Sequence, residues 1–390
     1  PAGSVPPDGR AYELVSPAQK LGGEVFPANP GFNSCDYACK PEGAFNSNAV
    51  FPMQSSSDGT AVAYEGYPFS LSEGASVFNA YISTRAASGW QASAVSAPLQ
   101  ATKFSGTKSS SRSLEQALIL QTKPPVLSPE ARQGYADLYL QATNHPASLR
   151  PLVTEAAFEA HPPHRTEEEF AIESFGHSAD FSRQFFAAND VLTGPTASAP
   201  EPPDPGFTGS DLYEWENGEL KLVNVLPGNT ASAPGASIPS TRHGNPGATF
   251  GSGRLLQSGN PSSPDVVAEN AISADGRRVY WSDGSGQLYL RLDGERTLEV
   301  PDHTGKFLTA SADGSQALLS DGKLYSLNEA DSRFEAPVDL TQGQGGFSGI
   351  SGRSTDLSHV YFVDTAALSG AGTNEHGEGG ELGQPNLYSW

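Results

Sequence analysis

Short runs of alternating apolar and polar residues recur along the chain, and six of them are built around Leu-Tyr or a close relative of it. A short alternating run that contains an aromatic residue is typical of a half-buried β-strand. The six tyrosines of these runs are Tyr81, Tyr139, Tyr213, Tyr289, Tyr325 and Tyr388. Repetition at this spacing predicts one supersecondary unit copied along the chain.

A polar turn followed by an apolar strand precedes each of these runs. The clean copies read Ser-x-Asp-Gly, and the most degraded one covers residues 112–116. The turn aspartates are Asp58, Asp180, Asp275, Asp313 and Asp356. Ser and Asp side chains can hydrogen-bond the backbone one or two residues on, and Gly takes the positive φ of a tight hairpin. The pattern therefore predicts two antiparallel strands joined by a tight turn.

Each unit is thus interpreted as strand, turn, strand, variable loop, Leu-Tyr strand and a fourth strand. Residues 90–95, 220–223, 297–300 and 337–340 are candidates for the fourth strand. Four antiparallel strands per unit is the composition of a β-propeller blade. We expect an all-β fold, a β-propeller in which residues 45–390 form six blades of a single domain spanning residues 1–390.

The length of the repeat varies almost entirely in one connection. The turn aspartate and the tyrosine are 12 residues apart between Asp313 and Tyr325, and 33 residues apart between Asp180 and Tyr213. Connections between second and third strands share one face of a propeller, so the insertions 193–209 and 369–383 should build one irregular surface. Binding residues often lie on such loops, although simple solvated insertions are the alternative interpretation.

The Ser-Ala-Asp-Gly turns, with the aromatic strands and the Leu-Tyr strands that follow, resemble the WD40-like, TolB-type β-propeller repeats of bacterial secreted proteins. The resemblance covers residues 45–390. The opening residues 9–17 are similar to the mature start of large surface proteins that carry such repeats. The resemblance implies a secreted or cell-surface propeller. It supplies no catalytic residues, because propellers host many unrelated functions.

The sixth unit ends at Trp390, directly after its third strand. In one interpretation, residues 12–15, within the segment 1–17, supply the fourth strand and close a six-bladed ring, which removes exposed sheet edges. In the other, the chain is a fragment of a larger propeller. Both hypotheses remain open from the sequence.

The charge balance argues against some classes of partner. The chain has 44 acidic and 23 basic side chains, a formal net charge of −21. Binding to nucleic acid or to anionic lipid depends on cationic contacts, so neither is expected. The sequence contains no apolar run long enough to span a membrane.

Two cysteines, Cys35 and Cys39, lie in the segment 18–44. Three residues between them allow a small local disulfide, which would fit an extracytoplasmic, oxidising compartment. Two free thiols are the alternative. No further Cys or His is spaced to complete a zinc site with them.

The chain offers little that predicts catalysis. The sequence Gly176-His177-Ser178 lacks the final Gly of a nucleophile elbow, so Ser178 is expected to be a turn residue. His161 and His164 are separated by two prolines and are expected in a surface loop. The acidic loops 283–286 and 374–378 do not fit the ligand spacing of a calcium loop. We therefore predict no catalytic, cofactor-binding or metal-binding residues.

These observations favour a secreted or cell-surface module that binds a protein or polysaccharide partner without catalysis, as a monomer. One alternative is a propeller-type polysaccharide hydrolase or lyase, with carboxylates gathered in the central funnel from several blades. Another is a TolB-like component of an envelope complex. The loop aromatics Tyr67, Phe69 and Phe207 could supply contact area for a partner.

Overall fold

The computed structural model describes residues 12–25, 54–66, 79–95, 105–121, 126–162, 164–193, 211–232, 236 and 270–390. These residues form two compact units, one holding the described residues up to Leu152 and the other running from Val153 to Trp390. Nearly all regular structure is antiparallel β-sheet, which confirms the all-β prediction. The single-domain organisation stays a prediction. Cys35, Cys39, Tyr67, Phe69 and Phe207 lie outside the described residues.

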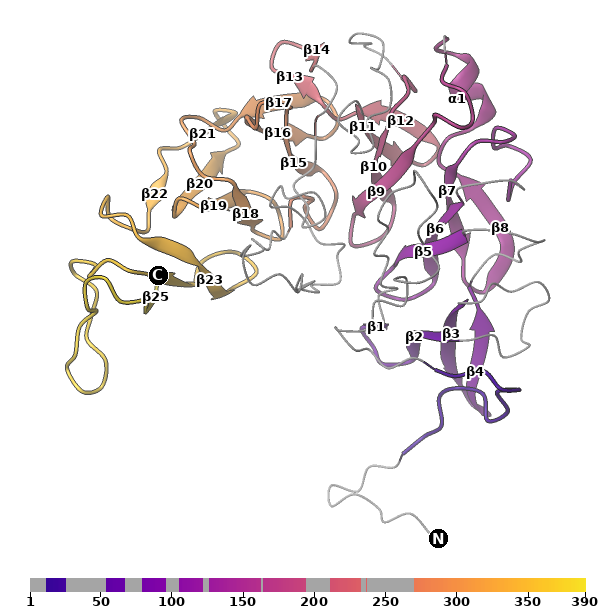
Figure 1. Ribbon diagram of the computed structural model, residues 1–390, viewed down its shortest axis with the longest axis horizontal. Helices are drawn as coiled ribbons and strands as arrows, with labels where there is room; N and C mark the ends of the chain where they lie inside the picture. The colour runs from indigo at the N-terminus through magenta and orange to yellow at the C-terminus, as the bar shows by residue number, and fades with distance from the viewer. Residues whose placement is uncertain are drawn as a thin grey trace. The chain divides into compact units, whose positions relative to one another are not determined.

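The first unit contains two four-stranded sheets whose strands pair in chain order (Figure 1). Sheet 1 comprises β1 (Gln54–Ser55), β2 (Ala61–Gly66), β3 (Asn79–Ala86) and β4 (Gly89–Ala94). Sheet 2 comprises β5 (Ser105–Ser110), β6 (Gln116–Gln121), β7 (Asp137–Ala142) and β8 (His145–Pro151). One apolar cluster joins them, with Ala63 and Ile82 from sheet 1 and Leu114 and Ala117 from sheet 2.

The second unit contains four further sheets in chain order. Sheet 3 comprises β9 (Ile172–His177), β10 (Arg183–Ala188), β11 (Asp211–Glu216) and β12 (Glu219–Leu222), and sheet 4 comprises β15 (Arg278–Ser282), β16 (Leu288–Leu292) and β17 (Arg296–Glu299). Sheet 5 comprises β18 (Phe307–Ala310), β19 (Gln316–Leu319), β20 (Lys323–Asn328), β21 (Arg333–Phe334) and β22 (Val338–Asp339), and sheet 6 comprises β23 (Phe347–Arg353), β24 (Val360–Asp364) and β25 (Asn386–Ser389). The described part of the unit also contains a short helix and a two-stranded ribbon, namely α1 (Glu155–Glu159), β13 (Val225–Leu226) and β14 (Thr230–Ala231).

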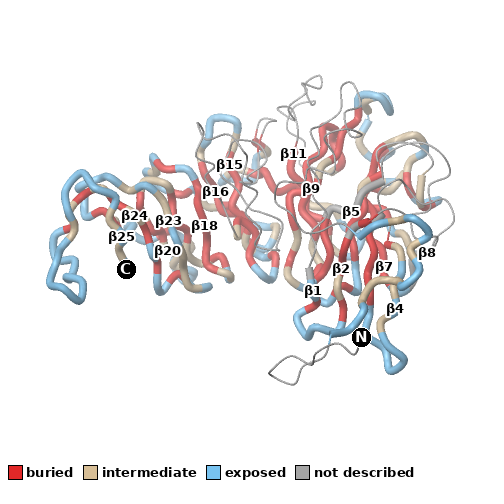
Figure 2. Tube along the Cα trace, turned by 60° about the horizontal axis from the view of Figure 1, so that its bottom comes forward, coloured by how far each residue is buried: buried red, intermediate tan, exposed pale blue. Residues whose placement is uncertain are grey.

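The sheets of the second unit pack on one another through apolar side chains. One buried cluster runs through sheets 3, 4 and 5, and includes Phe185, Trp281 and Tyr325. A second cluster joins sheets 5 and 6, with Leu324 and Phe362 among its members. Burial follows the strands while the connections are exposed (Figure 2). The alternating apolar runs are therefore the core of the unit.

The sixth sheet differs from the others in the burial of its Leu-Tyr strand. Leu324 of sheet 5 is 1% exposed, whereas Leu387, its equivalent in sheet 6, is 64% exposed. Tyr361 of β24 is also exposed. One face of sheet 6 thus has no neighbouring sheet packed against it within the described part of the second unit.

No closed ring is detected among the described residues, and residues 12–15 do not form the strand that one of the two hypotheses requires. These residues have no strand conformation, and the described sheet 6 has three strands in the order β23-β24-β25. Instead, the carboxylate of Glu13 accepts hydrogen bonds from Arg85 at 2.5 Å and from the Trp90 indole at 2.7 Å, and the Ser83 hydroxyl donates to Val15 O at 2.9 Å. Side-chain contacts with sheet 1, rather than a backbone ladder, fix this segment.

The strands of each sheet are connected at two opposite ends. The Ser-x-Asp-Gly turns lie at one end of the strands, which we call the turn edge. The connections to the Leu-Tyr strands leave from the opposite end, which we call the loop edge. The described loop-edge connections of the second unit include 283–287, 320–322 and 365–385. Within the described residues, no helix is long and apolar enough to cross a membrane.

Backbone hydrogen bonds link the turns of successive sheets, and we call this row the turn ladder. Ala179 N–H donates to Ala274 O, Ala274 N–H to Ala312 O and Ala312 N–H to Thr355 O, at 2.6, 2.6 and 2.7 Å. Ser57 N–H and Arg112 O form the corresponding bond in the first unit, at 3.2 Å. All these residues occupy the same position of the repeat, directly after its first Ser or equivalent.

The glycine of the turn takes the positive φ that its position requires, with values of 71° at Gly59, 70° at Gly276 and 73° at Gly314. In the drifted turns a residue with a large side chain adopts the same strained backbone conformation. Leu114, Phe181 and Leu357 have φ of 61°, 66° and 57°, and each is at most 2% exposed. Burial of a large apolar side chain offsets the cost of the left-handed conformation.

Candidate functional site

The turn aspartates hold the turns together. In sheet 5 the Ser311 hydroxyl donates to Asp313 Oδ1 at 2.6 Å, Ser315 N–H donates to the same oxygen, and Gln316 N–H donates back to Ser311 Oγ. The structure places Asp58, Asp180 and Asp275 in the same arrangement, and Asp356 in a closely similar one. Burial raises the pKa of Asp313, but the bonds from Ser311 and Ser315 outweigh it and lower that pKa. At Asp58, bonds from Ser56 and Thr60 lower the pKa to about 2.

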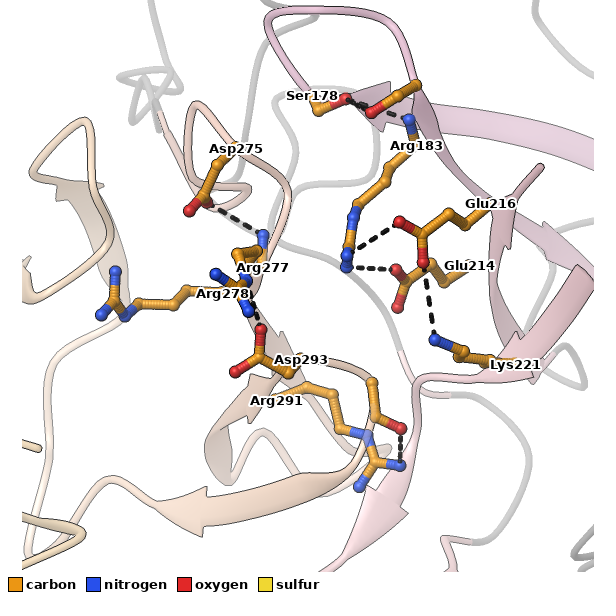
Figure 3. A network of polar contacts seen from close by, with 12 residues as sticks. Ser178, Arg183, Glu214, Glu216, Lys221, Asp275, Arg277, Arg278, Arg291 and Asp293 are labelled. Atoms are coloured by element: carbon orange, nitrogen blue, oxygen red, sulfur yellow. Dashed lines mark hydrogen bonds and ion pairs between the residues drawn. The ribbon is translucent and has the colours of Figure 1, made fainter.

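Charged side chains at the turn edge of sheets 3 and 4 form a paired network (Figure 3). Arg183 lies 2.7 Å from Glu214 and 2.9 Å from Glu216, and Lys221 lies 3.5 Å from Glu216. Arg277 pairs with Asp293 at 2.5 Å. Burial raises the pKa of Glu214, and Arg183 opposes the rise. Mutual pairing leaves these charges occupied, so the network is a structural feature of the sheets.

The repeat tyrosines anchor the loop-edge connections. Tyr213 OH donates to Asp190 O at 2.7 Å and accepts from Leu192 N–H at 3.1 Å. Tyr388 OH does the same with Ala366 O and Leu368 N–H, at 2.8 and 3.3 Å. We call this arrangement the tyrosine clamp, because the strand holds the start of the connection that precedes it.

The clamp changes with the length of the connection. Tyr139 OH accepts from Leu127 N–H at 3.4 Å, and Tyr289 OH reaches a side chain instead, the Asp283 carboxylate at 3.4 Å. Tyr325 follows a short connection, and its buried hydroxyl has no hydrogen-bond partner within the described residues. Burial, followed by the charges of Asp321 and Asp302, raises the pKa of Tyr325 to about 12. Tyr81 is buried and stacks on Tyr64, with ring centroids 5.7 Å apart.

A pocket of about 400 Å³ opens at the loop edge of the second unit, between sheets 4 and 5. It is lined by Ser282, Ser285, Gly286, Gln287, Leu288, His303, Thr304, Gly305, Lys306 and Phe307. One wall is the connection 283–287, and the other is the segment 303–307 that leads into β18.

Carboxylates inside the two walls fix their shape. Asp283 Oδ1 accepts hydrogen bonds from Ser285 N–H, the Ser285 hydroxyl and Gln287 N–H, at 2.9, 2.6 and 3.0 Å. Asp321 Oδ2 accepts from the Thr304 hydroxyl and from Gly305 N–H, at 2.9 and 3.2 Å. A Cβ at position 305 would lie 2.6 Å from the backbone nitrogen of Asp321, so only glycine fits this wall.

His303 joins the two walls. Its Nε2 accepts a hydrogen bond from Leu288 N–H at 3.0 Å, and its Nδ1 lies 3.2 Å from Gly305 O. A backbone N–H only donates and a carbonyl only accepts, so the ring is neutral with its proton on Nδ1. No sequence pattern points to this residue, because the segment 301–306 contains no repeat motif.

His164 lies in a loop, as the sequence predicts, but its side chain is directed inward rather than to the surface. Its side chain is 11% exposed, its Nδ1 lies 3.5 Å from the buried carboxylate of Asp190, and its ring meets Phe158 of α1 edge-on at 5.6 Å. The sequence does not reveal this burial for two reasons. Pro162 and Pro163 directly before His164 disfavour a helical pattern, and α1, against which the ring packs, has too few residues to produce a periodic signal.

The remaining sequence candidates are placed as follows. Ser178 donates to Asp180 at 2.5 Å and lies in the turn of sheet 3. Asp283 uses its carboxylate within its own loop, and Asn374 accepts from His376 N–H and Glu378 N–H in an exposed loop. Among the described residues, no group of three His, Cys, Asp or Glu side chains could hold a metal ion.

Comparisons with known proteins give structural likeness only. No family model matches the chain, and no curated protein matches it. Three similar structures are a prolyl endopeptidase, a protein assigned as TolB from Agrobacterium tumefaciens and the β-propeller domain of Myceliophteria thermophila Cps50 (Swd1).

These similarities are distant. The prolyl endopeptidase is 15% identical with a TM-score of 0.38, and the match covers 87% of this chain and 42% of that one. The TolB protein is 14% identical with a TM-score of 0.29, covering 73% of this chain and 78% of that one. The Cps50 domain is 10% identical with a TM-score of 0.27, covering 70% and 67%.

Proposed function

We propose that the chain is a β-propeller-type module, secreted or at the cell surface, whose loop edge binds a protein or polysaccharide partner without catalysis. Successive antiparallel sheets that pack face to face, each with the same turn and the same Leu-Tyr strand, support the propeller architecture. Six such units would be its blades.

The observation that carries the proposal is the tyrosine clamp. A binding surface on loops is effective only where a rigid scaffold holds the loops. The starts of two loop-edge connections are fixed by a tyrosine hydroxyl, at Tyr213 and Tyr388, while most of 369–385 is exposed to solvent. The pocket opens at the same edge of the same unit. Anchored loops and a pocket at the same edge of the unit favour binding as the use of this edge.

The binding experiment uses the full chain with a panel of insoluble cell-wall and plant polysaccharides, in which retention and released sugar are measured together. We expect retention without release. A variant in which residues 369–383 are replaced by a short Gly-Ser linker should lose retention of any partner that contacts this loop. Lys221→Met, at the turn edge, is the matched control and should retain it.

Other outcomes separate the alternatives. Released sugar that is abolished by changing carboxylates would make the chain a hydrolase or lyase and would contradict the proposal. Retention of no polysaccharide, together with capture of an envelope protein that the loop variant does not affect, would favour a TolB-like component of an envelope complex.

The proposed location has its own test. A disulfide between Cys35 and Cys39 is expected for an oxidising compartment. Mass spectrometry of a non-reduced digest of the exported protein would find the two cysteines in one cross-linked loop. Two free, alkylatable thiols would contradict this part of the proposal.

A further inference from the structure

The two walls of the pocket between sheets 4 and 5 present hydrogen-bond acceptors. A hydroxyl group has one proton to donate and two lone pairs. The Ser285 hydroxyl gives its proton to Asp283, and the Thr304 hydroxyl gives its proton to Asp321. Each of these oxygens can therefore only accept a hydrogen bond from a ligand.

One cationic donor stands at the same pocket. Lys306 lines it with an exposed side chain that makes no ion pair within the described residues. An ammonium group offers up to three protons and no lone pair. His303 has no ring nitrogen left for a ligand, since both are engaged with the walls.

The surroundings restrict the charge of a ligand. Asp283 and Asp321 lie directly behind the lining residues Ser285 and Thr304, and the whole chain has a net charge of −21. Like charges disfavour an anionic ligand in such a field, and the ammonium of Lys306 disfavours a cationic one. A neutral ligand that both donates to oxygens and accepts from an ammonium group fits best.

Two apolar side chains, Leu288 and Phe307, contribute a small apolar area to the lining, since both are 3% exposed. The volume of about 400 Å³ is within the usual range of small-ligand pockets. Sugar rings combine hydroxyl groups that donate and accept with an apolar face of C–H groups. We propose that this pocket binds one unit of a neutral saccharide, through Ser285, Thr304 and Lys306.

This inference rests on the proposed binding function and names the class of ligand. Isothermal titration calorimetry with the full chain would use cellohexaose, xylohexaose and mannohexaose as neutral probes, and an oligogalacturonate as an acidic one. We expect at least one neutral oligosaccharide to bind and the oligogalacturonate to bind more weakly. The inference would be overturned if the acidic probe bound more tightly than the neutral ones, or if none of the neutral probes bound.

Two single-residue variants test the site itself. Lys306→Met keeps the length of the side chain and removes the donor, so affinity should fall about tenfold or more. Ser285→Ala removes an acceptor from the opposite wall and should also weaken binding. Lys221→Met makes the same change of charge at the turn edge and should leave affinity within about twofold. Unchanged affinity in Lys306→Met would place the ligand elsewhere and contradict the inference.

The pocket and the wider proposal can fail separately. If polysaccharide retention persists in Lys306→Met but is lost on replacing residues 369–383, the pocket inference fails and the proposed function stands. If a peptide or protein competes for the pocket and no saccharide does, the ligand class is wrong. If neither retention nor any binding is found, both fail.

Discussion

The hydroxyl of Tyr213 donates a hydrogen bond to the carbonyl oxygen of Asp190, 2.7 Å away, across the start of the connection between β10 and β11. The same hydroxyl accepts from Leu192 N–H, so one buried group satisfies two backbone groups of the loop. The strand motif recognised in the sequence thus has a second role beyond its place in the core.

Replacing Tyr213 by Phe removes both bonds and leaves a buried carbonyl and a buried N–H without a partner. We expect the free energy of unfolding to fall by about 1–3 kcal/mol. Amide hydrogen exchange at Leu192 should also become faster. Urea unfolding and exchange monitored by mass spectrometry would measure the two effects.

Tyr325→Phe is the matched control at the same repeat position. The Tyr325 hydroxyl is buried and has no hydrogen-bond partner within the described residues. Its removal should leave stability unchanged or slightly raised. Equal losses for the two variants would mean that the ring, and not the hydroxyl bond to the loop, accounts for the effect of Tyr213→Phe.

The Leu-Tyr leucines should differ sharply between sheets 5 and 6. Leu324→Ala opens a cavity in a packed cluster and should cost about 2–5 kcal/mol of unfolding free energy. Leu387→Ala changes a residue that is 64% exposed and should cost no more than about 0.5 kcal/mol. Urea unfolding of the isolated chain checks both. A large cost at Leu387 would show that another surface covers it.

Two turn glycines at nearly the same φ separate backbone strain from close packing. A Cβ at Gly59 would meet nothing within 4 Å, so Gly59→Ala should cost about 1–2 kcal/mol for the left-handed conformation alone. A Cβ at Gly314 would lie 2.9 Å from the Cβ of Arg278 and 3.2 Å from that of Ser273. Gly314→Ala should therefore cost at least about 1 kcal/mol more. Thermal unfolding of both variants gives the difference, and equal costs would mean that the turn of sheet 4 moves aside.

The pH dependence of stability should carry the signature of Asp211. Burial raises the pKa of Asp211 to about 6, against a weaker opposing effect of its hydrogen bond from Asn224. The folded chain therefore binds more protons than the unfolded chain between pH of about 4 and about 6. In this window stability falls as pH rises, by about 2–3 kcal/mol from this group.

Asp211→Asn should remove that part of the pH dependence, because the amide oxygen can still accept from Asn224. Urea titrations at pH 4, 5, 6 and 7 should give a flatter profile for this variant. Asp331→Asn makes the same change of charge at a side chain that is 55% exposed, and should leave the profile unchanged. Parallel profiles for the wild type and Asp211→Asn would contradict the assignment.

The strands could be predicted because their information is local. Alternation of apolar and polar residues marks a strand within a few positions, and a Ser or Asp side chain reports its own turn. Residues 220–223 and 297–300 were placed in fourth strands on this basis, and β12 and β17 cover most of them. Residues 12–15 show the limit of such reasoning. Their apolar pattern suits a strand, but the contacts of Glu13 with Arg85 and Trp90 hold them against sheet 1 in a conformation that is not a strand.

The pocket could not be predicted, because it depends on how one sheet packs on the next. His303 and Leu288 are 15 positions apart, with His303 in the segment that leads into β18 and Leu288 at the start of β16. Nothing in either segment encodes their contact. The inward direction of His164 could not be predicted for the same reason, since its burial depends on Phe158 and Asp190, which precede and follow it in unrelated elements.

The turn ladder is made from backbone atoms, and this has a consequence for how such a chain can change over evolutionary time. The ladder position is occupied by serine, arginine, alanine and threonine, yet every residue there takes part in the same kind of backbone bond, namely Ser57, Arg112, Ala179, Ala274, Ala312 and Thr355. After a unit is duplicated or deleted, the units that become neighbours would still offer each other a backbone N–H and a carbonyl, whatever their side chains. Copies are therefore free to diverge at this position, and their number can grow or shrink, without this bond between neighbours having to arise anew each time.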